Sequence, residues 1–121
     1  MTDATTTIAE LRQTLAHFVA ERQWEPFHSP KNLAMSLAIE AAELMEHFQW
    51  ITIEESRALA RDDAKRALAG EELADVLAYV LAMANALQLD LAQTFREKLA
   101  KNAQKYPVEL SRGRHERPSV T

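Results

Sequence analysis

Apolar side chains recur at intervals of three and four residues through most of this chain, which is the repeat of an α-helix buried along one face. In the first such stretch Ile8, Leu11, Leu15 and Val19 form a single stripe. The pattern predicts helices over four stretches, residues 6–22, 30–50, 63–87 and 91–106. The polar residues 51–63 then form a connector, with a short helical turn expected at 54–60.

Residue types that favour helix starts support three of these boundaries. Ser29 stands directly before Pro30, which predicts an N-cap followed by proline at the first helical position, where its missing N–H costs nothing. Asp62 or Asp63 is expected to cap the third helix. Asp90 is expected to cap the fourth, with Gln93 three residues later as its capping-box partner.

Composition favours the same fold class. Alanine contributes 21 residues and leucine 15, against nine valines and isoleucines together, so the chain is poor in the β-branched residues that strands favour. A length of 121 residues supports one domain. We predict an all-α domain over residues 1–106, a four-helix bundle, and a mobile C-terminal tail over 107–121, which begins with a proline and has no apolar periodicity.

Several classes of protein are disfavoured. No apolar run approaches the ~20 residues that span a bilayer, and residues 1–7 lack an apolar signal core, so a cytoplasmic location is expected with no membrane partner. There is no cysteine, which excludes disulfides and thiolate metal sites. Residues 1–95 carry seven Lys/Arg against fifteen Asp/Glu, whereas residues 96–121 carry seven against three. An acidic body argues against nucleic acid as a partner; the asymmetry fits a metal–polyphosphate ligand, or is merely solvated charge.

Four acidic residues interrupt the apolar stripes of two successive predicted helices. Glu40 and Glu43 are spaced i, i+3, and so are Glu72 and Asp75, so each pair projects from one side of its helix. Both pairs fall within the apolar face, where an unpaired carboxylate would cost several kcal/mol. Carboxylates that converge there repel one another, and a divalent cation relieves that repulsion. Ligation by oxygen alone favours Mg²⁺, with Mn²⁺ as a substitute.

Two other interpretations of these acids remain open. A single Glu-x-x-Glu pair on a helix is usually solvated, and only the repetition on successive helices favours metal. A di-iron bundle would need Glu-x-x-His pairs, but Leu44 stands three residues before His47 and the second acidic pair contains no histidine.

Other polar and aromatic residues are candidates for substrate contacts. Lys98, Asn102 and Lys105 lie on one line of the fourth helix, where they hold phosphate oxygens or are simply a solvated face. The aromatic residues at helix ends and connectors, together with a histidine, either close the core or contact a nucleobase. These residues are Trp24, His28 and Trp50.

Longer motifs resemble a known family. They are FHSPKNL at 27–33, EAAEL at 40–44 followed by FQW at 48–50, EELADVLAY at 71–79 and KNAQKYP at 101–107. Together they resemble the MazG-like all-α nucleotide pyrophosphohydrolases, most closely the dCTP pyrophosphatase branch. The resemblance covers residues 8–112.

The resemblance implies Mg²⁺-dependent hydrolysis of a deoxynucleoside triphosphate, with dCTP or a modified dCTP preferred, to the monophosphate and pyrophosphate. It also implies a homotetramer, a dimer of dimers whose sites combine residues of several chains. Ala41 and Ala42 depart from the glycine that the family commonly carries there, which could narrow the site. The implied metal ligands are Glu40, Glu43, Glu72 and Asp75; the implied phosphate contacts are Lys98, Asn102 and Lys105; and the implied base pocket is Trp24, His28, Trp50 and Tyr79.

The remaining choices stay open at the level of sequence. A glutamate of the cluster is expected to act as general base, with Glu43 slightly favoured and Glu46 as the second candidate. Glu46 and Glu71 lie near the cluster, where either is an extra metal ligand or orients the water. Leu73, Leu77 and Leu81 lie off the main apolar stripe and are expected to pack on a second subunit. The alternative functions are a broad-specificity or dUTP pyrophosphatase, and a non-catalytic helical interaction module.

Overall fold

The computed structural model describes residues 1–118 of the chain. Within that range the protein consists of helices and connecting turns, with no strand, which confirms the all-α class. Its elements form two compact units, Met1–Gln88 and Leu89–Thr121. None of the helices in the described part of the chain combines the length and the apolar character that crossing a membrane requires.

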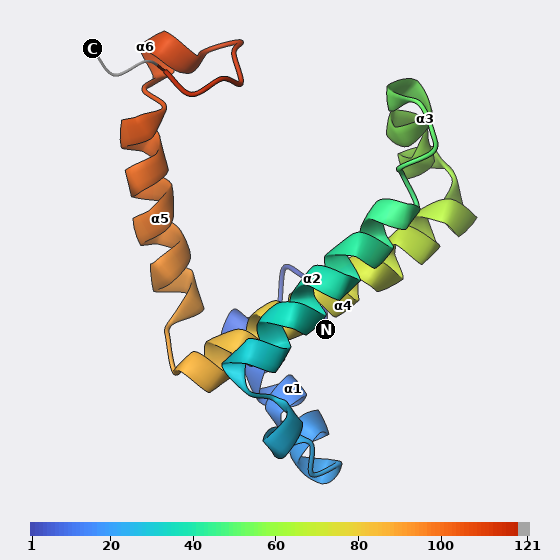
Figure 1. Ribbon diagram of the computed structural model, residues 1–121, viewed down its shortest axis with the longest axis vertical. Coiled ribbons are helices and arrows are strands. Elements are labelled where there is room, and N and C mark those ends of the chain that lie inside the picture. The colour runs from blue at the N-terminus through green and yellow to red at the C-terminus, as the bar shows by residue number, and fades with distance from the viewer. Residues whose placement is uncertain (119–121) are drawn as a thin grey trace. The chain divides into compact units, whose positions relative to one another are not determined.

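The first unit is built on the pair of helices α2 (Pro30–Glu46) and α4 (Asp63–Leu87), which pack side by side along their length (Figure 1). Helix α1 (Ile8–Glu21) also packs on α4. A 3-10 turn η1 (Glu25–Phe27) leads into α2. Along the chain, α2 and α4 are connected by the short helix α3 (Ile53–Ala58) and the 3-10 turn η2 (Leu59–Arg61).

The second unit contains α5 (Leu91–Lys105) and the short helix α6 (Val108–Ser111). The side chain of Asp90 caps α5 by accepting a hydrogen bond from the backbone N–H of Gln93 at 2.8 Å. The last turn stops before Pro107, as expected for a residue without an N–H. Helix α6 places regular structure inside the predicted tail 107–121, and residues 119–121 of that tail lie outside the described residues.

The predicted caps of the first unit also form. Ser29 accepts from the N–H of Asn32, and Asp62 accepts from the N–H of Lys65, so the sequence pattern locates the starts of α2 and α4 correctly. The end of α2 differs from the prediction, because the helix stops at Glu46 and not near residue 50. The N–H groups of His47 and Phe48, directly after the helix, donate to carbonyls three residues back, which tightens the chain into a turn over 47–50.

Few side chains are fully buried in this chain. Val19 of α1, Leu33 of α2, and Leu81, Ala82 and Ala84 of α4 form the buried core, and Leu33 is 1% exposed. Leu81 is therefore already covered, whereas its predicted companions Leu73 and Leu77 stay exposed.

Hydrogen bonds between Arg12 of α1 and Asn85 of α4 join these two helices. The guanidinium Nε of Arg12 donates to Asn85 Oδ1 at 2.9 Å, and Asn85 Nδ2 donates to the backbone oxygen of Arg12 at 3.3 Å. Because both groups are partly buried, these bonds fix the orientation of α1 on α4 beyond what apolar packing alone specifies.

Candidate active site

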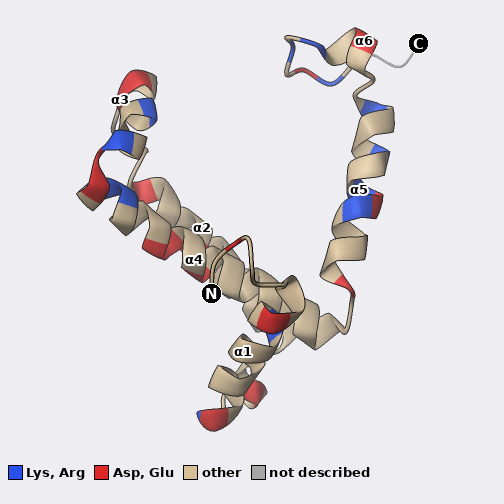
Figure 2. Cartoon of the chain, turned by 180° about the vertical axis from the view of Figure 1, so that it is seen from behind, with Lys and Arg blue, Asp and Glu red and all other residues tan. Residues whose placement is uncertain are grey.

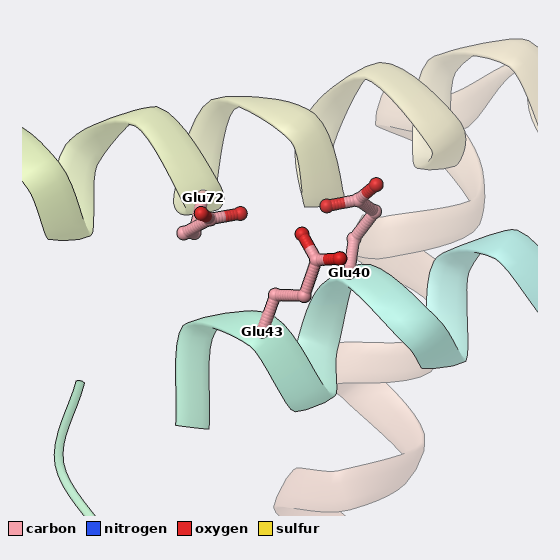
Figure 3. A group of neighbouring side chains, drawn as sticks. All are labelled: Glu40, Glu43 and Glu72. Carbon is pink, nitrogen blue, oxygen red and sulfur yellow. The ribbon is translucent and has the colours of Figure 1, made fainter. Parts of the chain in front are cut away.

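Three of the predicted acidic residues converge where α2 faces α4. Glu40 and Glu43 come from α2 and Glu72 comes from α4, and one carboxylate oxygen from each lies within 4.8 Å of the others. Figure 3 shows the three side chains directed into the space between the two helices. The i, i+3 spacing puts the two α2 carboxylates on the face that packs on α4.

The cluster formed by Glu40, Glu43 and Glu72 contains two oxygens that are buried without a hydrogen-bond partner. Glu40 Oε2 and Glu72 Oε2 are shielded from solvent and receive no hydrogen bond from the described residues. A buried carboxylate oxygen that accepts no hydrogen bond destabilises the folded state, because it has lost its hydration and gained no other donor. A bound divalent cation would satisfy both oxygens, and an all-carboxylate donor set fits Mg²⁺ or Mn²⁺. The residues present therefore fit the metal that the sequence predicts.

Burial and mutual repulsion also change the protonation of the cluster. Burial, with the neighbouring carboxylates of Glu43, Asp75 and Glu72, raises the pKa of Glu40 from its ordinary 4.5 to about 7. Burial likewise raises the pKa of Glu72, again with contributions from Glu43 and Asp75, and His47 opposes that shift. The cluster thus holds more carboxylate charge than its surroundings stabilise in the absence of a cation.

Asp75 lies one turn after Glu72 on α4, and its side chain is exposed. Its charge acts on both Glu40 and Glu72, which places it beside the cluster, but its oxygens are outside the group that lies within 4.8 Å. The other candidate acids, Glu46 and Glu71, are exposed and are not part of that group either.

His47 is a neighbour of the cluster that the sequence analysis did not assign to the site. Its Nε2 lies 3.9 Å from Glu72 Oε1, with both side chains largely covered. The signal was present in the sequence, because His47 follows Glu43 by four residues and Glu40 by seven, on the same helix face. His47 also lines a pocket of 330 Å³, here called the His47 pocket, together with Ile51, Glu55, Ala58, Leu59, Asp62, Lys65 and Leu68.

The predicted base-binding residues are dispersed within one chain. His28 is half-buried and lines a second pocket of 410 Å³. Trp24 precedes α2 and packs edge-on against Phe18, with ring centroids 5.9 Å apart. Trp50 follows α2 and is 86% exposed. Since the 17 residues of α2 span about 25 Å, Trp50 lies too far from the residues before α2 to share one base with them in a single subunit.

The second pocket, here called the His28 pocket, is mostly apolar. Its lining comes from α1, η1 and α4, and residues that the sequence analysis missed, Glu25 and Asn85, supply polar groups beside His28. The full lining is Leu15, Ala16, Val19, Ala20, Glu25, His28, Ala82, Asn85 and Ala86. Tyr79, on α4, is half-buried and is not among these residues.

The predicted phosphate contacts all belong to the second unit. Lys98 and Lys105 are exposed on α5 and Asn102 is half-buried. Figure 2 shows the Lys and Arg positions of this helix in blue and the acidic positions of α2 and α4 in red. The acidic part of the sequence thus forms most of the first unit, and the basic part belongs to the second.

Carboxylates that converge on facing helices of an all-helical chain offer donors that fit a divalent ion, and comparison with known proteins gives the family. The model of the MazG-like family matches residues 35–117, so the chain belongs to the MazG-like family. It is 45% identical over 107 residues to dCTP pyrophosphatase 1 of Mus musculus, covering 88% of this chain and 63% of that protein. It is 41% identical over 106 residues to dCTP pyrophosphatase 1 of Homo sapiens, covering 88% of this chain and 62% of that protein.

A solved structure shares the fold. The crystal structure of a pyrophosphatase from Archaeoglobus fulgidus matches with a TM-score of 0.74 and 37% sequence identity, covering 88% of this chain and 98% of that one. The chain therefore spans less than two thirds of the length of the mammalian relatives but nearly all of the archaeal one.

The raised pKa values predict how pH affects the metal-free protein. Glu40 has a pKa of about 7 in the folded chain against 4.5 ordinarily, so between these values the native state binds more protons than the unfolded state. The free energy of unfolding should then fall as pH rises from about 4.5 through 7. Thermal unfolding with a chelator should give a lower melting temperature at pH 8 than at pH 6.

The matched variant for this measurement is Glu40→Gln, which keeps the shape of the side chain and removes its charge. The decline in melting temperature between pH 6 and pH 8 should be smaller in this variant. A melting temperature that rises over this interval, or an equal decline in the variant, would contradict the account of the cluster.

Proposed function

We propose that this chain hydrolyses a deoxynucleoside triphosphate, with dCTP or a modified dCTP preferred, to the monophosphate and pyrophosphate. The observation that carries the proposal is the convergence of Glu40, Glu43 and Glu72 with two buried oxygens that lack hydrogen-bond donors. The names of the mammalian relatives and of the archaeal structure support the substrate and the reaction. Such an enzyme would remove unwanted deoxynucleotides from the pool, and a free nucleotide substrate also fits the expected cytoplasmic location.

The four predicted ligands are proposed to hold Mg²⁺, with Mn²⁺ as a substitute. Glu40, Glu43 and Glu72 supply oxygens within reach of one ion. Asp75, whose oxygens lie outside that group, is proposed to complete the set from the next turn of α4. When bound, the ion neutralises triphosphate charge and makes a water molecule more acidic. The chain's own contribution is to keep these carboxylates together on two packed helices before substrate arrives.

Glu43 is the proposed general base, with Glu46 as the second candidate. Figure 3 shows the Glu43 carboxylate directed toward those of Glu40 and Glu72, so a water molecule held at the cluster can pass its proton to Glu43. Glu46 is exposed on α2, one turn after Glu43, and would have to act from the edge of the cluster.

The phosphates are proposed to lie against α5. Lys98, Asn102 and Lys105 follow one another at i, i+4 and i+7, so one face of that helix offers two ammonium groups and an amide. Lysine binds phosphate as a point charge, and the amide adds a directed donor.

The base is proposed to occupy the His28 pocket. At 410 Å³ the pocket is large enough for a small ligand, and His28, Glu25 and Asn85 give an otherwise apolar lining its few polar groups. Trp24 and Tyr79 are proposed to border the base from the same subunit. Trp50, at the far end of α2, would reach a base only from another subunit.

An oligomer, a tetramer built as a dimer of dimers that completes the helical bundle, is proposed to supply those contacts. Large apolar side chains stay exposed on both long helices of the first unit, and burying them stabilises association. They are Met35, Ile39 and Met45 on α2, and Leu68, Leu73 and Leu77 on α4.

Release of pyrophosphate tests the reaction. With Mg²⁺ present, dCTP should yield dCMP and pyrophosphate, and Glu43→Gln or Asp75→Asn should lower the rate by about 10²–10⁴-fold. Glu46→Gln distinguishes the two candidate bases: it should keep turnover if Glu43 is the base, whereas loss of turnover with Mg²⁺ binding intact would assign the base to Glu46. Glu54→Gln, an exposed change on α3, is the control that should keep full activity.

Two results would be incompatible with the proposed reaction. Near-normal activity of Glu43→Gln at saturating Mg²⁺ would remove that residue from the site. A protein that neither hydrolyses any nucleotide nor gains thermal stability with Mg²⁺ would be a non-catalytic helical module.

Base preference tests the pocket. The kcat/KM for dCTP should exceed that for dATP and dGTP, and His28→Ala should reduce this ratio by roughly three- to tenfold, the effect of one hydrogen bond. Trp50→Ala should raise KM for every base with little change in kcat, since stacking of ~1–3 kcal/mol is similar in the ground and transition states. Equal kcat/KM values for purine and pyrimidine triphosphates would reject a dCTP pocket and leave a broad-specificity enzyme, and a preference for dUTP would reassign the base.

Light scattering coupled to gel filtration tests the oligomer. The mass should be several times the 13.7 kDa of one chain, and Leu77→Glu, which places charge on an exposed apolar position of α4, should lower it. A stable and active 13.7 kDa monomer would refute the proposed assembly.

A further inference from the structure

His47 lies at the end of α2 with its ring directed to the carboxylate cluster. Its Nε2 is 3.9 Å from Glu72 Oε1, which is too long for a hydrogen bond. The side chain of His47 is 30% exposed and that of Glu72 is 24% exposed, so the two groups meet in a partly desolvated place. The histidine therefore faces a carboxylate of the cluster without bonding to it directly.

That separation fits two donors of one metal ion. Bonds of roughly 2.0–2.1 Å put adjacent donors of an octahedral ion roughly 3 Å apart and opposite donors roughly 4 Å apart, so the 3.9 Å between Nε2 and Oε1 matches two opposite donors. In the metal-free chain the nitrogens of His47 lie outside the group of donor atoms within 4.8 Å of one another, so the ring has to move toward the ion when it binds. The position along α2 agrees, because Glu40, Glu43 and His47 follow at intervals of three and four residues on one face. Glu72 Oε2, the other oxygen of the same carboxylate, is one of the two buried oxygens without a donor.

The surroundings of the ring leave room for the rest of a coordination sphere. His47 also lines the His47 pocket of 330 Å³, so one side of the ring faces the cluster and another borders an open volume. Water or phosphate oxygens could approach an ion from this side without displacing the buried carboxylates.

We propose that His47 Nε2 is a direct ligand of the divalent ion at the cluster, and that this nitrogen shifts the site from Mg²⁺ toward Mn²⁺ and related transition ions. Mg²⁺ demands oxygen donors, whereas first-row transition ions accept imidazole readily. The inference rests on the proposed metal site and adds to it a ligand outside the four predicted carboxylates.

The test uses Mn²⁺ as the probe, with the full chain and no nucleotide. The electron spin echo of bound Mn²⁺ should show modulation from a coordinated imidazole nitrogen. The modulation should be lost in His47→Leu and in His47→Gln, which keeps a polar side chain of similar length. His17→Gln is the matched control, because His17 is exposed on α1 and is paired with Glu21 at 2.9 Å, so it should retain the signal.

Metal affinity gives the second readout. By titration calorimetry His47→Leu should weaken Mn²⁺ binding at least about tenfold, within the range found for altered metal surroundings, and Mg²⁺ binding by clearly less. Circular dichroism of both His47 variants should show unchanged helix content, which keeps the comparison valid.

The outcomes separate this inference from the proposed function. Bound Mn²⁺ without nitrogen modulation in the wild-type chain, or an unchanged ratio of Mn²⁺ to Mg²⁺ affinity in both His47 variants, would overturn the role of His47 while dCTP hydrolysis stands. Failure of the wild-type chain to bind Mn²⁺ or Mg²⁺ and to release pyrophosphate would overturn the metal site and the inference together.

Discussion

One carboxylate oxygen of Glu40 and one of Glu72 lose contact with water where α2 packs along α4, and the rest of the site depends on that loss. Apolar burial holds the two helices together, and it covers acidic groups that would be stable in solvent. Burial first, and then the negative charges of Glu43, Asp75 and Glu72, raise the pKa of Glu40 to about 7. A chain that only had to fold would gain from replacing these acids with apolar residues. Their presence at the contact therefore supports the proposed cation site.

Much of the frame that positions these acids is readable from the sequence. Periodicity located α1, α2, α4 and α5, and polar residues located the starts of α2, α4 and α5, because a cap is a local interaction between neighbours in the chain. The capping box of Thr7 and Glu10 at the start of α1 did not contribute to that prediction. The short helical turn expected at 54–60 corresponds to α3 and η2, and the capping box of Thr52 and Glu55 marks its start. The end of α2 was not predictable from propensity, because residues 47–50 are compatible with another helical turn and the chain instead tightens there.

The site could be predicted only as far as single-helix spacing reaches. That spacing grouped Glu40 with Glu43 and Glu72 with Asp75, and the structure shows that the first pair meets Glu72 across the helix contact. It could not show that His47 faces Glu72, because that contact depends on how far α2 is offset along α4. The predicted helix over 30–50 already put Trp24 before its start and Trp50 at its end, and the length of α2 separates the two within one subunit. That separation makes the proposed oligomer part of the argument about base recognition.

The central claim is that the buried carboxylates form one cation site, and proton release on metal binding tests it most directly. Titration calorimetry with Mg²⁺ near pH 7, in buffers of different ionisation enthalpy, counts protons displaced per ion bound. Because the pKa of Glu40 is about 7 in the metal-free chain, binding should release a substantial fraction of a proton, and Glu40→Gln should abolish most of that release. Saturable Mg²⁺ binding without any proton release, unchanged in Glu40→Gln, would show that the ion binds elsewhere and would contradict the account.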